Sequence, residues 1–543
     1  MAGYRDWISI ACFGTIFHQR YRKHEPTLTR FLWETVLVCG AATIPSMSRA
    51  AGLTLVDAFR TFCLVTLGYV SSLCISVIIY RHSPLHPLAR FPGPAVAIST
   101  KWWMVHRILI KGGRHTKLQT LHAAHGPWVR VGPNELSVNL PGAIKVIYGQ
   151  LDRGPFYQGT PANADTLITV VDRKIHVRRR QAWTKAVTGD AMRSFIPLVE
   201  GRVDQLMNIF RSRASQNLPT DIDHWINLFF MDTMGDMGFS GGFETMVSGR
   251  DTEDWLKTLS AGVIFVSCMG QVPWLRDLFR FLPKSGPIQS FQAFTQAKVD
   301  EIQKTTTRRK DILGIIMNDT SPSLTSDEAA ADASLIVVAA TDTSVQTVIT
   351  LLRHVAVNAD CVRRLQEEIS TVVDCGNTDV AALSELPYLD ACVQEALRMM
   401  PPGPFGPPRT TGLTGVHICG TWVPPRTTVH VPVYAMHRDP AFFGVHADKY
   451  IPERWLEDER KLNSELEPFD TTAFMPFSNG YGSCVGKQLA VQNIKILIAS
   501  ILRSFDIRPA DGFNETAFDA SYQEYGLWTH APLKLMMAPR QKE

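Results

Sequence analysis

The chain has 543 residues, of which 45% are hydrophobic and 20% are charged. These fractions are close to the averages of globular proteins, so a mainly disordered or fibrous chain is excluded. The 55 lysines and arginines nearly balance the 51 aspartates and glutamates, and the resulting net charge of +4 gives no overall footprint for nucleic acid.

The first element that the sequence indicates is a membrane anchor. Residues 61–80 carry no charged side chain and lie between Arg60 and Arg81. A helix of about 20 such residues crosses the hydrocarbon core of a bilayer, whereas a buried core helix rarely stays uncharged on all faces for this length. We therefore expect a membrane-anchor region at 1–81, with its best transmembrane helix at 61–80 and a second candidate span at about 31–48.

Basic residues lie on both sides of these apolar segments. Four of them follow a third, short apolar stretch at 7–17, and others follow residue 80. The positive-inside rule places both basic groups in the cytosol, so the chain must cross the membrane twice between them. We expect a hairpin made of the apolar segments at about 31–48 and 61–80, with the remaining chain in the cytosol.

The rest of the chain reads as a hinge followed by one domain. Residues 82–95 contain four prolines, which stop a helix and stiffen the chain. They either fix the angle between domain and membrane or form a plain linker. Residues 96–543 contain no low-complexity linker, and their periodicity is mostly helical with short strands at 128–131 and 428–432. We predict a mostly α domain with small β-sheets.

A long helix is predicted over 328–352. The capping-box pattern Thr325-Ser-Asp-Glu328 precedes it, and its middle is apolar on every face, which indicates burial. The polar run Asp342-Thr343-Ser344 nevertheless lies there, and burial of an unpaired carboxylate is costly. The carboxylate is either satisfied by a partner or marks a polar notch where the helix opens toward a reaction site. We favour the notch, because Ala339-Ala340 leaves room beside it.

A second helix is expected between Pro387 and Pro401. It carries Glu395 and Arg398, which share a face and can pair. Exposed pairs of this kind contribute little stability, but the flanking residues are unusually apolar. A buried pair needs a third partner, and Arg454 offers one because a guanidinium binds a carboxylate through paired donors.

The most informative segment is 474–486, where three glycines and a serine surround Cys484. A helix is predicted directly after it, over 487–502, so free N–H groups can point at the sulfur. Both features lower the pKa of a thiol, and the glycines let a flat partner approach the backbone. The pattern favours an axial ligand to haem iron. A structural buried cysteine would explain neither the glycines nor the helix start.

Together, these motifs resemble the cytochrome P450 superfamily in their order and spacing. The resemblance covers roughly residues 90–540. The membrane segment, the Pro-rich hinge and the stretch 125–137 are similar to the microsomal, reductase-dependent class of fungi, and the multi-segment N-terminus resembles those of mushroom-forming fungi. The resemblance implies the P450 fold, with haem sandwiched between a long central helix and a Cys-bearing loop, and a haem-thiolate catalytic domain at 96–543. It also implies a location in the endoplasmic reticulum membrane, with this domain on the cytosolic face.

The resemblance assigns roles to residues that match the family's motifs. Cys484 matches the axial ligand of the iron in haem b. The loop positions that pack near the sulfur or the haem match Phe477, Gly480 and Gly486. The ion-pair network that supports this side of the haem matches Glu395, Arg398 and Arg454. The acid–alcohol pair that delivers protons for oxygen activation matches Asp342 and Thr343.

The haem propionates have fewer matching partners than usual. His176, Arg180 and Arg409 match positions that bind them, with His176 standing where many members have Trp. Gly482 stands where most members have Arg or His, so haem binding must depend on the other three. Ala340 stands where many members have Gly, and its methyl group narrows the oxygen groove.

The activity implied by the resemblance is monooxygenation. One atom of O2 is inserted into a C–H bond, and NADPH-cytochrome P450 reductase supplies the electrons. Arg178 and Arg179 either dock that partner or form a solvated basic face. Regions that match substrate contacts are apolar and favour a hydrophobic molecule, with a terpenoid or other specialised metabolite ahead of a xenobiotic or a fatty acid. These residues are Phe156, Tyr157, Leu167, Val337, Phe405, Leu527 and Trp528.

Two other classes use the same loop. A haem-thiolate isomerase or dehydratase would need no proton relay, so Asp342 and Thr343 argue against it. A non-catalytic haem-binding membrane protein would show no turnover with any electron donor.

Overall fold

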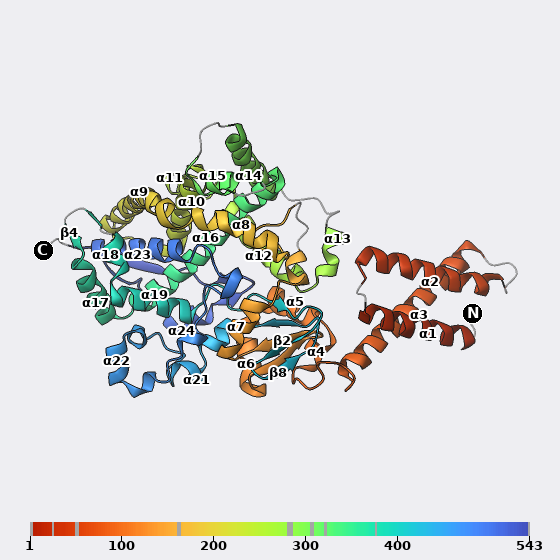
Figure 1. The fold of residues 1–543 in the computed structure, drawn as a ribbon. Helices are drawn as coiled ribbons and strands as arrows, with labels where there is room; N and C mark the ends of the chain where they lie inside the picture. Colours follow the sequence, from red (N-terminus) through yellow and green to blue (C-terminus); the bar gives the residue numbers. More distant parts are fainter. Residues whose placement is uncertain are drawn as a thin grey trace.

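The computed structural model describes residues 4–23, 26–48, 54–159, 164–279, 286–304, 309–319, 323–374, 377–378 and 380–540. Three helices at the N-terminus stand apart from a large, mostly helical body (Figure 1). The predicted fold class, mostly α with small β-sheets, is confirmed.

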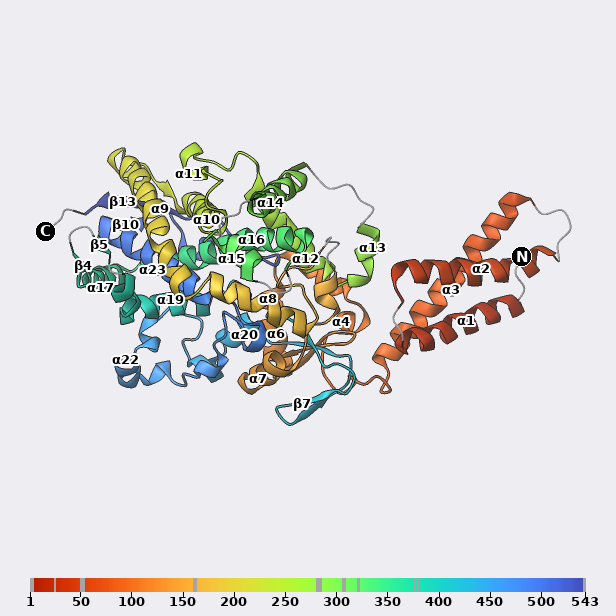
Figure 2. The same ribbon diagram turned by 45° about the horizontal axis from the view of Figure 1, so that its top comes forward.

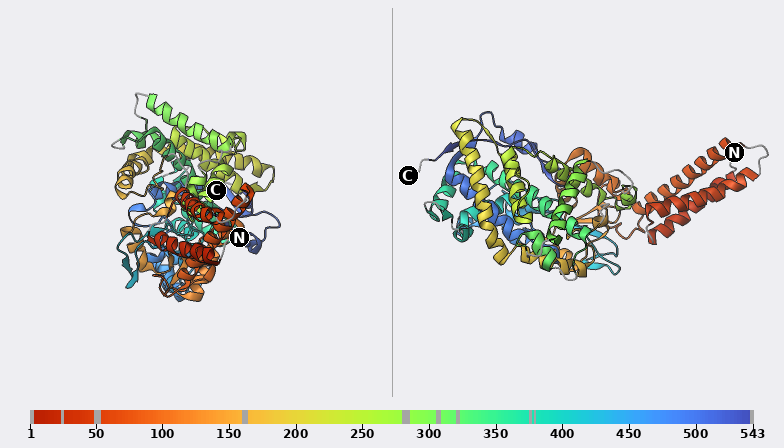
Figure 3. Two further views of the ribbon diagram at one scale, coloured as in Figure 1. Left: turned by 90° about the vertical axis from the view of Figure 1, so that its right-hand side faces the viewer. Right: turned by 90° about the horizontal axis from the view of Figure 1, so that it is seen from above.

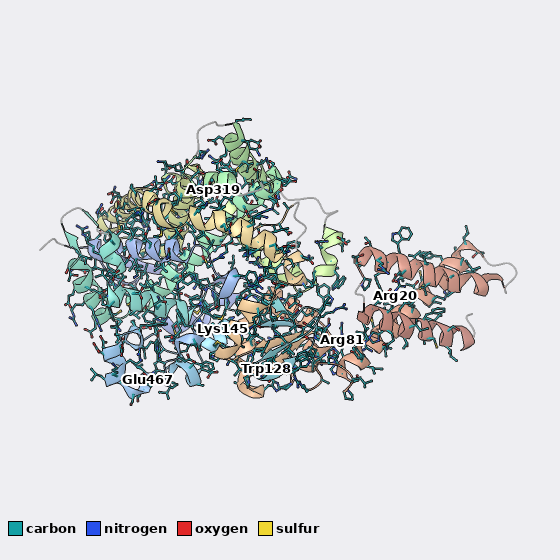
Figure 4. All side chains as sticks on the ribbon, viewed as in Figure 1. Arg20, Arg81, Trp128, Lys145, Asp319 and Glu467 are labelled. Atoms are coloured by element: carbon teal, nitrogen blue, oxygen red, sulfur yellow. The ribbon has the colours of Figure 1, made fainter. Side chains whose placement is uncertain are left out.

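The three N-terminal helices are α1 (Tyr4–Lys23), α2 (Leu28–Ser48) and α3 (Leu55–His82). They run antiparallel, with the N-terminus at the end away from the body (Figure 3). The predicted span 61–80 lies within α3, which begins earlier because Thr54 and Asp57 form a capping box. Arg20 on α1 and Arg81 on α3 both lie near the end that faces the body (Figure 4).

Two described helices are long and apolar enough to cross a membrane, α3 and α16 (Ser326–Val355). Their surroundings differ. Within its most apolar window, 67% of α16 is buried inside the body, as in a core helix, but only 17% of α3 is buried. The exposed side chains of α3 include Leu64, Leu67 and Ile75.

The Pro-rich segment after α3 packs against the body. Arg130, on the first strand of the body, donates its backbone N–H to Pro92 O at 2.7 Å and its Nη1 to Arg81 O at 3.1 Å. Leu88 and Phe91 are buried. The segment is therefore fixed to the sheet and is not a plain linker.

Within the described residues, five small sheets lie among the helices. The four-stranded sheet has the order β1 (Trp128–Gly132), β2 (Glu135–Val138), β9 (Thr428–His430) and β6 (Arg409–Thr410). The three-stranded sheet has the order β10 (Phe505–Pro509), β13 (Lys534–Pro539) and β3 (Thr220–Asp221). The two-stranded pairs are β4 (Val373–Asp374) with β5 (Asn377–Thr378), β7 (Val416–Ile418) with β8 (Thr421–Val423), and β11 (Gln523–Glu524) with β12 (Trp528–Thr529).

The longer helices of the body surround α16, which runs through its middle (Figure 2). They are α6 (Arg114–His125), α7 (Pro141–Gln150), α8 (Arg173–Ala186), α9 (Gly189–Ser215), α10 (Ile222–Phe239), α12 (Trp255–Met269), α14 (Gly286–Lys304), α17 (Ala359–Ser370), α19 (Pro387–Met399) and α23 (Lys487–Ser504). The shorter ones are α4 (Ala95–Ser99), α5 (Trp102–His106), α11 (Thr245–Ser248), α13 (Arg276–Phe279), α15 (Ile312–Asp319), α18 (Val380–Ser384), α20 (Val433–His437), α21 (Pro440–Phe443), α22 (Glu457–Leu462) and α24 (Glu515–Ala520).

The start of the central helix follows the sequence pattern. Glu328 donates its backbone N–H to Thr325 Oγ1 at 3.2 Å, and Thr325 donates its N–H to Glu328 Oε2 at 2.9 Å. From there α16 buries apolar side chains against α10, α19 and α23. The middle of this helix forms one wall of the cavity described next.

Candidate functional site

A cavity of about 1030 Å³ lies inside the body. It is bordered by α16, α8, α12, the segment 164–169 and the loop 475–486 that precedes α23. Most of its lining is apolar, including Leu259 and Val263 of α12 and Phe291 of α14. The loop at one wall and the small residues of α16 at another were both expected near a reaction site.

The backbone of the loop fixes the position of Cys484. Its N–H donates to Phe477 O at 2.9 Å, which closes the loop on itself. Gly480 has φ +67°, and a Cβ there would collide with the carbonyl oxygen of Tyr148, so only glycine fits this position. Cys484 is accessible from the cavity, although the surrounding protein separates its thiol from bulk water, and Phe477 borders the same cavity.

The expectation that this loop lowers the pKa of the Cys484 thiol is wrong for the free thiol. Burial raises that pKa, and it outweighs the opposing effects of a hydrogen bond from the Gly486 backbone and of the nearby Arg180 and Lys487. A coordinated metal ion reverses this balance, because it deprotonates a ligand thiol outright.

Gly482 and Gly486 of the loop both border the cavity, but the space around them differs. A Cβ built at Gly486 meets nothing within 4 Å among the described residues. The protein itself would therefore accept a side chain there, and the absence of one suits a flat group lying against the loop. A Cβ at Gly482 would lie 2.6 Å from Arg409 Nη2, so that space is already taken.

Four basic side chains converge beside Gly482. Three of them, His176, Arg180 and Arg409, were predicted, and all three border the cavity. Arg180 donates to the carbonyl oxygen of Ser483 at 2.5 Å and so also holds the loop. Arg409 donates to Tyr157 Oη at 2.8 Å.

The fourth basic residue, Arg153, was missed by the sequence analysis. Its Nη2 lies 3.2 Å from His176 Nε2, and its Nη1 donates to Leu167 O at 3.0 Å. No motif marks it, because only the fold brings the segment after α7 to the loop. In the described part of the chain, Arg153 Nε, Arg409 Nε and His176 Nδ1 have no hydrogen-bond partner.

These residues fit the haem that the resemblance implies. A thiol lies on the cavity wall, glycine backbone allows close approach of a macrocycle, and buried unpartnered N–H groups suit carboxylates. Among the described residues, no cluster of three or more His, Cys, Asp or Glu side chains offers an alternative metal site.

The polar run of α16 reaches the cavity without breaking the helix. Thr343 borders the cavity together with Ala339 and Ala340, and its hydroxyl donates to Ala339 O at 2.7 Å. Thr347 donates in the same way to Thr343 O at 3.0 Å. These bonds to the preceding turn satisfy the hydroxyls, so α16 is continuous and the expected opening of the helix is absent.

Asp342 is half-buried and does not itself border the cavity. The structure records no hydrogen bond or ion pair of its carboxylate to another described residue. Burial raises the pKa of Asp342 to about 6. A carboxyl with this pKa is poised to hold and release a proton near neutral pH, one residue from the cavity-lining Thr343.

Glu395, Arg398 and Arg454 form the buried network that the sequence predicted. Arg398 donates to both carboxylate oxygens of Glu395, at 2.8 and 2.7 Å, and Arg454 Nε donates to Oε1 at 2.9 Å. Trp455 Nε1 and the Ile451 N–H complete the shell at 2.9 and 2.8 Å. Although burial opposes it, this shell lowers the pKa of Glu395 to about 2.

His437 links this network to the Cys loop, and no sequence motif marks this residue. Arg398 Nη1 donates to His437 O at 2.7 Å, and His437 Nε2 lies 3.0 Å from the Met475 N–H at the start of the loop. Burial and the charge of Arg398 lower the pKa of His437 to about 3. The neutral ring can therefore accept the hydrogen bond from Met475.

The predicted substrate contacts separate into two groups. Tyr157, Leu167 and Leu527 border the cavity. The other four are outside its lining. Val337 is fully buried in the core, Phe156 packs on Tyr157, Phe405 packs on His430, and Trp528 packs on His115. These four residues lie close to cavity-lining residues along the chain, but their side chains pack against other residues and do not line the cavity.

Arg179 also differs from expectation. Its side chain is buried and pairs with Asp332 at 2.7 Å, so it belongs to no solvated face. Asp332 in turn accepts the Leu167 N–H at 2.9 Å. The pair thus holds the segment that places Leu167 on the cavity wall.

Comparison with known proteins identifies relatives along most of the chain. The family model described as Cytochrome P450 matches residues 94–531. The chain is 32% identical to Cytochrome P450 monooxygenase FCK2 of Fusarium pseudograminearum over 473 residues, which cover 85% of this chain and 84% of that protein. It is 31% identical to Cytochrome P450 monooxygenase nodW of Hypoxylon pulicicidum over 548 residues, 98% of each chain. It is 30% identical to Trichothecene C-15 hydroxylase of Fusarium sporotrichioides over 486 residues, 86% of this chain and 96% of that one.

Proposed function

Because the chain belongs to the cytochrome P450 family, as a monooxygenase of the fungal type, we propose that it hydroxylates a hydrophobic small molecule, a terpenoid or another specialised metabolite. The observation that carries the proposal is the thiol of Cys484 on the wall of a cavity of about 1030 Å³ with a mostly apolar lining. The relative named as a trichothecene C-15 hydroxylase supports hydroxylation as the reaction type.

The family implies a haem iron cofactor. When bound, haem b would supply oxygen activation and C–H oxidation, and the Cys484 thiolate would hold its iron. The chain contributes the surroundings of that chemistry. The loop presents the sulfur to the cavity, Gly486 would let a flat ring approach the backbone, and His176, Arg180 and Arg409, which border the cavity, would bind its carboxylates.

Protons reach the cavity through α16 in this proposal. Thr343 places its hydroxyl on the cavity wall, and Asp342 holds a proton beside it because burial raises the pKa of its carboxyl. Leu259, Val263 and Phe291 exclude water from the rest of the space.

The chemistry of the cavity supports an uncharged substrate. Arg276 also borders it, but its Nη1 donates to Gln158 O at 3.3 Å and its Nε lies 3.7 Å from Asp277. These two contacts orient the guanidinium, and we propose that it does not bind a substrate carboxylate. A terpenoid fits such walls better than a fatty acid, whose carboxylate needs a cationic partner.

We place the protein in the endoplasmic reticulum membrane, with its body in the cytosol, where NADPH-cytochrome P450 reductase donates electrons. The exposed apolar surface of α3 supports an anchor. The basic residues Arg20 and Arg81 support a cytosolic position for the end that faces the body.

The test is product analysis after co-expression of the full chain with a reductase. A panel of terpenes, fatty acids and aromatic xenobiotics is supplied, and Cys484→Ser is the control. Oxygenated terpene products that require NADPH, O2 and Cys484 support the proposal. Oxidation of fatty acids or xenobiotics alone overturns the substrate class. Products that form without NADPH and O2 indicate an isomerase or dehydratase, and no product with any donor indicates a non-catalytic haem protein.

A further inference from the structure

Two free cysteines meet inside the body, outside the cavity that Cys484 borders. Cys361 lies in the first turn of α17, and Cys392 lies in α19. Their thiols hydrogen-bond to each other, and both side chains are buried, with exposed fractions of 5% and 0%. Neither residue is part of the lining of the large cavity. The pair is therefore separate from the proposed reaction site.

A second, smaller pocket of about 430 Å³ reaches one member of the pair. Cys361 and Tyr388 belong to its lining, whereas Cys392 does not. The lining also includes the exposed side chains of Arg363 and Glu367, so the pocket opens to the surface. A small, uncharged oxidant such as hydrogen peroxide can enter this space. It reaches the sulfur of Cys361 first.

The surroundings of the two thiols make them chemically unequal. A hydrogen bond from the Cys392 thiol lowers the pKa of Cys361, although burial opposes it, and Tyr388 Oη donates to Cys361 Sγ at 3.3 Å. The N-terminus of α17 favours a negative charge in the same place. Burial raises the pKa of Cys392 well above its ordinary value. Because the thiolate is the nucleophilic form, Cys361 is the thiol that attacks an oxidant.

We propose that Cys361 and Cys392 form a redox-active pair, which hydrogen peroxide converts into a disulfide. The sulfur of Cys361 attacks one peroxide oxygen, the O–O bond breaks, and the proton lost by the thiol leaves with the second oxygen as water. The sulfenic acid formed on Cys361 is then attacked by the sulfur of Cys392, so that an S–S bond forms, the S–O bond breaks and a second water leaves. Two thiols are thereby oxidised by two electrons, and one peroxide is reduced to two waters.

The disulfide acts on the buried network around Glu395. Cys392 lies one turn before Glu395 in α19, and its carbonyl oxygen accepts a hydrogen bond from Tyr450 Oη at 2.9 Å. The next residue, Ile451, donates its N–H to Glu395 at 2.8 Å. A covalent S–S bond is much shorter than a contact between two thiols, so its formation pulls this turn of α19 toward α17. We therefore expect oxidation to loosen the network and, through it, the Cys loop.

The experiment follows each thiol of the full-length, detergent-solubilised protein during exposure to hydrogen peroxide. An azole inhibitor is added to occupy haem iron, so that peroxide reacts with thiols alone. Mass spectrometry after alkylation and digestion should find peptides joined through Cys361 and Cys392, and dithiothreitol should separate them. Cys268 is the internal control, because it is 6% exposed and burial raises its pKa to about 11. Cys361 should be oxidised about tenfold faster than Cys268.

Three variants separate the steps. Cys392→Ala should stop the reaction at a sulfenic acid on Cys361, which dimedone labels. Cys361→Ser should leave Cys392 reduced. Tyr388→Phe removes the hydroxyl that donates to Cys361 Sγ and should slow oxidation by about threefold to tenfold. Hydrogen exchange of residues 474–486 should become faster in the oxidised wild type, and it should stay unchanged in peroxide-treated Cys361→Ser.

Each result decides one part of the inference. Oxidation of Cys361 no faster than that of Cys268, or oxidation of Cys392 at the wild-type rate in Cys361→Ser, overturns the redox pair. If Cys392→Ala does not accumulate, the wild type and Cys361→Ser alone decide this point. A disulfide that leaves the exchange of residues 474–486 unchanged overturns the link to the Cys loop. The proposed function fails separately, through absence of haem or of product.

Discussion

At the scale of single residues, Asp342 shows a conflict between stability and function. Its carboxyl is half-buried without a recorded partner, and burial raises its pKa from 3.8 to about 6. Because the folded pKa is above the unfolded one, ionisation of Asp342 destabilises the fold. The cost is absent below about pH 4, grows as the pH rises to about 6, and is constant above that.

Asp342→Asn should therefore increase stability at pH 7.5 by about 1–3 kcal/mol and have little effect near pH 4. The same variant should form less product per NADPH consumed, because an amide cannot supply a proton. Thermal unfolding at several pH values and measurements of coupling check both expectations. A variant that is more stable at pH 7.5 but fully coupled would show that Asp342 is outside the proton path.

Gly480 is a second residue whose identity follows from local geometry. Its φ of +67° and the nearby Tyr148 carbonyl exclude a Cβ. Gly480→Ala should destabilise the loop by about 1–3 kcal/mol and reduce the haem content of purified protein. Gly149→Ala is the control, because a Cβ at Gly149 meets no atom of the described residues within 4 Å. Equal haem contents in the two variants would contradict this reading of the loop.

At the scale of elements, one buried carboxylate joins α19, the Pro452–Trp455 turn and, through His437, the Cys loop. Glu395 and both arginines are fully buried. This arrangement orients the loop more than it stabilises the chain, because desolvation of the charges offsets much of their attraction. Removal of a single member is costly for the same reason.

Glu395→Gln keeps the shape of the side chain but leaves two buried guanidinium groups without a counter-charge. We expect a loss of about 3–5 kcal/mol in stability, together with haem content well below that of the wild type. Glu367→Gln removes an exposed i,i+4 partner of Arg363 at 3.0 Å and should cost less than about 0.5 kcal/mol. Thermal denaturation and absorbance spectra compare the two variants. Similar losses in both would contradict the assigned role of the network.

At the scale of the whole molecule, the three N-terminal helices suggest a topology. The start of α1 and the end of α2 lie at the end away from the body, whereas Arg20 and Arg81 lie near the body (Figures 3 and 4). Helix α1 packs closely on α3, where Ser72 Oγ donates to Ala11 O at 2.9 Å. From this packing we expect α1 and α2 to cross the bilayer together with α3, in place of the two-segment hairpin with a cytosolic N-terminus, although among the described N-terminal helices only α3 is by itself long and apolar enough to do so.

The N-terminus should then be lumenal, and the α1–α2 connection cytosolic. A glycosylation acceptor sequence added before residue 4 should be modified in microsomes, and one inserted between α1 and α2 should not. The shift in electrophoretic mobility after glycosidase treatment reports both. Modification of the inserted site alone would reverse the topology, and modification of neither would favour fewer spans.

Local sequence patterns were enough to predict several features of this protein. The cap at Thr325, the long apolar stretch before Arg81, the Glu395–Arg398 spacing and the glycines around Cys484 are local patterns, so the helices, the anchor candidate and the family could be predicted from them. Local patterns suffice there because capping, helical periodicity and backbone conformation depend on residues close in the chain.

Only the tertiary structure decided which side chains meet. Arg153 reaches His176, and His437 reaches Met475, across separations that no pattern records. Val337 is buried in the core and Phe405 packs on His430, so neither side chain lines the cavity. Burial raises the pKa of the Cys484 thiol and outweighs the effect of the loop that was expected to lower it. Such outcomes depend on long-range packing and on the desolvation it imposes, which are properties of the assembled fold.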